Sequence, residues 1–143
     1  YRETGVLVKN ASVLALLLLF PERPLGEGRL AGLTVEGLER AEARAAELVS
    51  ELHEARCDRD DAPLLGAEFS LAADLMRHGC RLGIARLETP GGAVASIPST
   101  KRTALAADLE RIIHEYRRVW LLRNREGGLR DSAARLQLLL RLY

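Results

Sequence analysis

Residues 111–143 read RIIHEYRRVWLLRNREGGLRDSAARLQLLLRLY, and this stretch decides the fold. Its first half repeats large apolar residues every three or four positions, which is the spacing of one face of an α-helix. The pair Gly127-Gly128 is expected to end that helix in the left-handed conformation, which glycine adopts without steric cost. Asp131 is expected to cap a short returning helix that carries a leucine stripe. Two helices joined by a glycine corner predict a helical bundle.

The preceding part of the chain shows the same kind of pattern, with a good capping residue before each helical segment. The expected helices are 11–20 after Asn10, 35–57 after Thr34, 62–87 after Asp61, a fourth that begins at Ser99 or Thr100, and the last from about Ser132. Prolines and glycines at 21–32 and 89–98 indicate two loops, of which the second is glycine-rich enough to be mobile. No strand-like alternation of any length occurs. The sequence therefore predicts an all-α fold, a bundle of about five mostly antiparallel helices.

Two expectations about packing follow from the apolar residues. The helix 11–20 is apolar nearly all round, so we expect it to be wedged between the bundle and a body that precedes it. A chain separated from that body should then expose Val13, Leu16, Leu17 or Phe20 and associate through them. The core residues expected from the helix 62–87 are Leu64, Leu65, Leu71, Leu75, Met76, Leu82 and Ile84.

Composition narrows the class of protein. A chain of 143 residues suits a single domain with a packed core, and its net charge of +1 argues against a nucleic-acid-binding protein. Two cysteines do not make a disulfide framework, so ordinary thiols in a reducing, cytoplasmic compartment are favoured. The apolar run 13–20 is much shorter than the roughly 20 residues that cross a bilayer, so no membrane segment is expected.

The last stretch also carries a family resemblance. The sequence W-L-L-R-N-R at 120–125, followed by G-G-L at 127–129 and by Ser132, resembles the C-terminal end of certain bacterial glycoside hydrolases of family 20. These enzymes are exo-acting β-N-acetylhexosaminidases. The sequences YRETG at 1–5 and NASVL at 10–14 resemble the segment where such enzymes leave their catalytic barrel. The resemblance implies that residues 1–9 are an exit segment and that residues 10–143 are a helical C-terminal domain.

The resemblance also bears on activity. Family 20 enzymes carry an adjacent Asp-Glu pair at the active site, and this sequence contains no such pair, so no catalytic residue is assigned to it. We expect the chain alone to be inactive and to need no cofactor. Its expected partner is the catalytic barrel of the same parent chain, and a homodimer contact is a second possibility. The parent would act on glycans that end in N-acetylhexosamine.

Four residues at the corner are the candidates for a site, namely Trp120, Arg123, Asn124 and Arg125. In one interpretation Trp120 fills the core and the arginines pair with carboxylates at the helix end. In the other, the corner abuts the barrel or a second subunit and helps to shape the rim of the sugar-binding site. Aromatic rings stack on sugars and arginine binds carboxylates, so the residue types permit the second role.

Two other classes of function remain open. One is a free-standing helical module that binds a partner helix through 11–20. The other is a small metal or phosphorelay regulator, suggested by His114 and by two histidine–cysteine pairs. Those pairs, His53/Cys57 and His78/Cys80, would lie roughly 25–30 Å apart in an antiparallel hairpin, so no shared metal site is expected.

Overall fold

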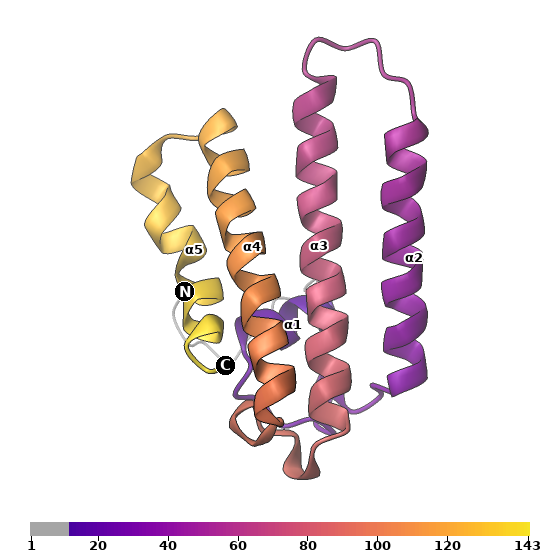
Figure 1. Cartoon of the computed structure of the whole chain (residues 1–143), viewed down its shortest axis with the longest axis vertical. Helices are drawn as coiled ribbons and strands as arrows, with labels where there is room; N and C mark the ends of the chain where they lie inside the picture. The colour runs from indigo at the N-terminus through magenta and orange to yellow at the C-terminus, as the bar shows by residue number, and fades with distance from the viewer. Residues whose placement is uncertain (1–11) are drawn as a thin grey trace.

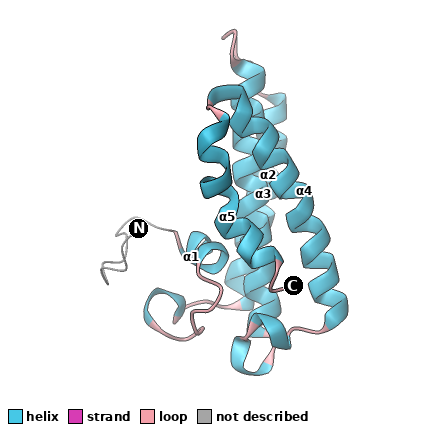
Figure 2. Ribbon diagram, turned by 90° about the vertical axis from the view of Figure 1, so that its left-hand side faces the viewer, coloured by secondary structure: helices cyan, strands magenta, loops and turns pink. Residues whose placement is uncertain are grey.

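The computed structural model of the chain describes residues 12–143. Within that range every regular element is a helix, which confirms the all-α class and the five-helix count (Figures 1 and 2). The α-helices are α1 (Val13–Leu19), α2 (Val35–Glu54), α3 (Ala62–Leu87), α4 (Ser99–Arg123) and α5 (Leu129–Leu140). Single 3-10 turns lie between them at Gly28–Leu30, Pro90–Gly92, Val94–Ser96 and Glu126–Gly128.

Helix α3 is the element on which the others pack. It contacts α1, α2 and α4, while α5 packs on α4 and α1. Helices α2 to α5 run alternately up and down, and the turn between α2 and α3 projects beyond the turn between α4 and α5 (Figure 1). The short helix α1 lies against the side of this array (Figure 2).

The helix starts follow local capping chemistry. Thr34 caps α2 as predicted, because its Oγ1 accepts a hydrogen bond of 3.0 Å from the backbone N–H of Gly37. Helix α1 is capped by Ser12, whose Oγ accepts from the N–H of Ala15 at 3.0 Å. The predicted cap Asn10 lies outside the described residues. Asp61 precedes α3, but its carboxylate accepts from Arg59 at 2.8 Å instead of from the helix.

The corner between α4 and α5 differs from its prediction. Helix α4 already ends at Arg123, because the next residue is extended, and neither Gly127 nor Gly128 has a positive φ. Gly128 matters through its missing side chain, since a Cβ there would lie 3.2 Å from Cζ2 of Trp120. The capping prediction for Asp131 is also wrong, because α5 begins two residues earlier and Asp131 makes no capping hydrogen bond.

The core is also arranged differently from the prediction. Leu71 and Leu82 are buried as expected, but Met76 is exposed. The idea that α1 is wedged against a preceding body is not supported, because its own chain already buries Leu16, Leu17 and Leu18. The loop 89–98 is anchored rather than loose: it buries Val94 and Ile97 in the main hydrophobic cluster.

A tight crossing of three helices fixes where α1 and α2 meet α3. At Gly83, a Cβ would lie 2.7 Å from Cδ1 of Leu38 and 3.0 Å from Cδ1 of Leu17. Both leucines are buried, so neither can move away without opening the core. Gly79, one turn earlier, lies directly beneath Leu14 of α1. The two glycines thus let α1 and α2 approach the backbone of α3.

This crossing generates the first prediction. Gly83→Ala should lower the unfolding free energy by about 1–2 kcal/mol, because the new methyl group overpacks the site. Gly66→Ala is the matched control in the same helix: nothing lies within 4 Å of its Cβ position, so it should stabilise by about 0.5–1 kcal/mol. Urea unfolding measures both. A stabilising Gly83→Ala would show that the crossing is not tight.

Candidate functional site

The four predicted residues lie together at the end of α4. The ring of Trp120 stacks on Tyr116 with centroids 5.9 Å apart and an interplanar angle of 28°. The Trp120 indole N–H donates to the carbonyl oxygen of Arg125 at 3.2 Å, and the Asn124 amide donates to the carbonyl oxygen of Trp120 at 3.3 Å. Trp120 is half-buried, whereas Arg123, Asn124 and Arg125 are exposed. The corner is therefore closed by hydrogen bonds among its own residues.

Arg123 connects this corner to the start of α3. Its Nε donates to Glu68 Oε1 at 2.5 Å, and its Nη2 lies 3.7 Å from Asp61 Oδ2. This contact matches the first interpretation of the corner, in which the arginines pair with carboxylates. The Arg123 guanidinium already pairs with carboxylates of its own chain, so those contacts would have to break before Arg123 could bind an external carboxylate.

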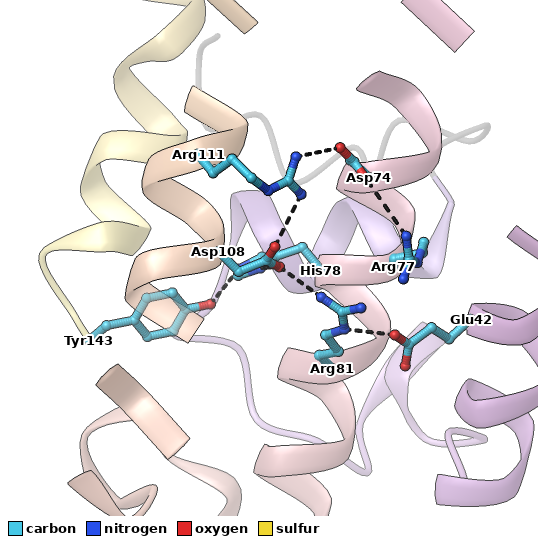
Figure 3. A network of polar contacts seen from close by, with 8 residues as sticks. All are labelled: Glu42, Asp74, Arg77, His78, Arg81, Asp108, Arg111 and Tyr143. Atoms are coloured by element: carbon cyan, nitrogen blue, oxygen red, sulfur yellow. Dashed lines mark hydrogen bonds and ion pairs between the residues drawn. The ribbon is translucent and has the colours of Figure 1, made fainter. Parts of the chain in front are cut away.

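A second polar cluster, which sequence reasoning did not identify, joins residues of α2, α3 and α4 to Tyr143 (Figure 3). His78 of α3 is fully buried, and both of its ring nitrogens are hydrogen-bonded. Nδ1 pairs with Asp108 Oδ2 of α4 at 2.9 Å, and Nε2 pairs with the Tyr143 hydroxyl at 2.8 Å. These contacts join α3, α4 and the residue at the end of the chain.

A periodic signal could have located this histidine. Leu71, Leu75, His78 and Leu82 follow one another at spacings of four, three and four, so they share one face of α3. In the sequence His78 stands out only as a neighbour of Cys80, and its partners Asp108 and Tyr143 are 30 and 65 residues away. Such a partnership depends on the tertiary fold and leaves no local pattern.

Burial and charge set the protonation of this cluster. Burial lowers the pKa of His78 despite the neighbouring Asp108, so the imidazole is neutral at pH 7. Burial alone would raise the pKa of Asp108, but hydrogen bonds from His78 and Arg111 hold it below its usual value. Burial raises the pKa of Tyr143. The chain of donors is therefore Tyr143 O–H to His78 Nε2, and His78 Nδ1–H to Asp108.

Two arginines connect Asp108 to further carboxylates, one on α2 and one on α3. Arg81 donates to Glu42 of α2 at 2.6 Å and to Asp108 at 3.2 Å. Arg111 donates to Asp74 at 2.7 Å and to Asp108 at 3.1 Å. The carboxylate of Asp108 thus receives three side chains, and Figure 3 shows them converging on it.

The chemistry open to this cluster is limited. An Asp–His–Tyr chain resembles a proton relay, but a working relay needs a ring nitrogen or hydroxyl that can reach a substrate. Both nitrogens of His78 are already engaged, and its ring has no exposed surface. The arrangement is suited to fixing the relative positions of helices and not to a reaction.

One further buried charge ties two loops together. Arg86 of α3 is buried, its Nε donates to the carbonyl oxygen of Gly92 at 2.7 Å, and its Nη2 donates to that of Arg23 at 2.6 Å. Burial lowers its pKa, and nearby Glu22 and Tyr143 oppose that shift. Arg86 thereby joins the loop that follows α1 to the loop that precedes α4, near the C-terminal end of α3.

The predicted histidine–cysteine pairs are far from forming one site. His53 and Cys57 are exposed at the projecting end of the α2–α3 hairpin, whereas His78 and Cys80 are buried in the lower half of α3. Burial raises the pKa of the Cys80 thiol to about 11, so it stays protonated. Within residues 12–143, no group of three potential metal ligands gathers.

Comparisons with protein-family models, with curated proteins and with solved structures find no match for this chain. Among the helices of the described range, none combines the length and the apolar character needed to cross a membrane.

The buried histidine predicts a pH-dependent stability. The pKa of His78 is lower in the folded than in the unfolded state, where it is about 6.5, so its contribution is complete above that pH. It is lost as the pH falls through the lower folded-state pKa. His78→Gln should reduce the unfolding free energy by about 2 kcal/mol at pH 7, and by less at pH 5.

Chemical denaturation at both pH values measures this difference. His114→Gln is the control, because His114 is exposed and the substitution should change stability by less than about 0.5 kcal/mol. A His78→Gln deficit that grows between pH 7 and pH 5 would mean that His78 is protonated in the fold.

Proposed function

We propose that this chain is a non-catalytic helical domain of a glycoside hydrolase that removes terminal N-acetylhexosamine residues. In this role it packs on the catalytic barrel of its parent and stabilises the loops at the active-site rim or a dimer contact. The proposal rests on the sequence resemblance to family 20 enzymes at 120–132 and 1–14.

The observation that carries the proposal is the architecture of the corner. The residues on which the resemblance depends interlock: Trp120 packs over Gly128, receives the Asn124 amide on its carbonyl and donates to Arg125. The side chains of Trp120 and Asn124 and the absent side chain of Gly128 each contribute to the closed turn, so these three positions act together. This is the behaviour of a structural motif, and it supports an architectural role.

The polar cluster around His78 supports the same architectural role. Asp108, His78 and Tyr143 are each engaged inside the chain, so the cluster contributes rigidity and not a reactive group. A rigid helical body is suited to holding the position of loops on a neighbouring domain.

The alternative of a free-standing module that captures a partner helix through 11–20 has less support. Three central leucines of α1, Leu16, Leu17 and Leu18, are already covered by the rest of the chain. A partner helix would have to displace α1 from the crossing at Gly83 before reaching them.

The proposal is tested by assaying purified protein with p-nitrophenyl N-acetyl-β-glucosaminide. The chain alone should release no p-nitrophenol, whereas the parent protein should release it at a rate that depends on the Asp-Glu pair upstream. Deleting residues 12–143 from the parent should lower its melting temperature. Turnover by the isolated chain, or a parent without hexosaminidase activity, would refute the proposal.

A substitution separates support from direct sugar binding. Trp120→Ala in the parent should lower its stability by about 2 kcal/mol, and Trp120→Phe by less, because a phenyl ring keeps the stacking on Tyr116. If the corner acts as support, Trp120→Phe leaves the KM unchanged. A KM raised tenfold without loss of stability would place Trp120 at the sugar-binding rim.

A further inference from the structure

Helices α4 and α5 lie on the side of the bundle away from α2 (Figure 1), and α4 carries a stripe of exposed residues. The members of this stripe follow one another at alternating spacings of four and three residues, so they share one face of the helix. They are Thr103, Ala107, Glu110, His114, Arg117 and Leu121, which we call the α4 stripe. Leu121 is 51% exposed, although it is a large apolar residue. This face of α4 is therefore open to solvent in the part of the chain that the structure describes.

A hollow of about 200 Å³ lies along the α4 stripe, between α4 and α5. Its lining residues are Glu110, Ile113, His114, Arg117, Gln137 and Leu140. The four polar side chains among them make no hydrogen bond or ion pair within residues 12–143. By contrast, Arg111, Glu115 and Arg118 of the same helix are all paired. The hollow thus presents a carboxylate and a guanidinium that are free to pair with another molecule.

The order of residues along the α4 stripe indicates which molecule fits. Glu110 precedes His114 by four residues and Arg117 follows it by three, while Ala107 and Leu121 lie seven residues before and after it. A two-fold axis beside His114 would set α4 antiparallel to a second α4. Glu110 would then face Arg117, and Ala107 would face Leu121, and symmetry makes each pairing occur twice. Opposite charges meet, and a small side chain meets a large one, so the stripe is complementary to itself.

The size of this face is consistent with a second copy as the occupant. Helix α4 is ~37 Å long and the α4–α5 pair is ~20 Å wide, which gives on the order of 600 Å² on each copy because α5 is shorter. A typical stable interface buries about 800 Å² on each partner, so the contact is expected to be weak. A small ligand in the hollow would leave Ala107 and Leu121 uncovered, whereas a second copy covers the whole stripe.

We propose that the chain forms a symmetric homodimer through the α4 stripe, in which Glu110 of each copy pairs with Arg117 of the other. Gln137 and Leu140 of α5 border the same contact. A dimer contact is one part of the function proposed above, and in that respect the inference rests on it. Its test measures association alone, so a negative result leaves the hexosaminidase assay undecided, and the reverse also holds.

Sedimentation velocity of the full chain, from micromolar to submillimolar concentrations, tests the proposal. The unsubstituted chain should dimerise reversibly. Glu110→Arg or Arg117→Glu places like charges opposite each other twice, so each should weaken the dimer at least about tenfold. Glu39→Arg is the matched control, because Glu39 is exposed on α2 and the change in net charge equals that of Glu110→Arg. A chain that stays monomeric, or a dimer that Glu39→Arg weakens as much as Glu110→Arg does, would overturn the proposal.

Combining the two reversals in one chain separates a charge pair from a general loss of association. The double variant Glu110→Arg/Arg117→Glu has the net charge of the unsubstituted chain, and opposite charges again face each other across the two-fold axis. Its dimer should therefore be restored to within about threefold of the original dissociation constant. A double variant as weak as the single variants would show that Glu110 and Arg117 do not pair between copies, and the proposal would fail.

Discussion

The rest of the structure depends on the two hydrogen bonds that the buried imidazole of His78 makes. A neutral ring with both nitrogens in the protein interior must keep two partners, because an unpaired buried polar group costs about 1–3 kcal/mol. Its partners are Asp108 of α4 and Tyr143, so the position of α3 along α4 and the position of Tyr143 depend on each other. Arg81 and Arg111 extend that coupling to Glu42 of α2 and to Asp74. The polar cluster around His78 thereby favours one relative placement of the helices among those that leucine packing alone would permit.

The glycines and the corner complete this arrangement at the two ends of the molecule. Gly79 and Gly83 admit α1 and α2 to the backbone of α3, and Gly128 admits the ring of Trp120 at the turn into α5. In each place the absent side chain matters through packing and not through a left-handed backbone. These features are internal to the chain, and they are the reason for proposing an architectural role for it.

The helices could be predicted from sequence because their signals are local. Leucine periodicity predicted that α2 to α5 exist. The Thr34 cap predicted the start of α2, and Ser99 was one of two predicted starts of α4. The corner was mispredicted because double glycine usually signals a left-handed cap, whereas here an extended Asn124 ends the helix. Met76 was assigned to the core because it shares a helix with core leucines, yet its side chain is exposed. His78 was considered only as a partner of Cys80, and its contacts with Asp108 and Tyr143 were not predicted because they come from distant segments.

The coding sequence upstream of Tyr1 offers the most direct test of the central claim, that this chain is the helical support of a hexosaminidase. The account predicts an open reading frame that continues upstream for the length of a catalytic barrel and contains an adjacent Asp-Glu pair. A start codon immediately before Tyr1 would contradict the account, because the chain would then have no catalytic body to support.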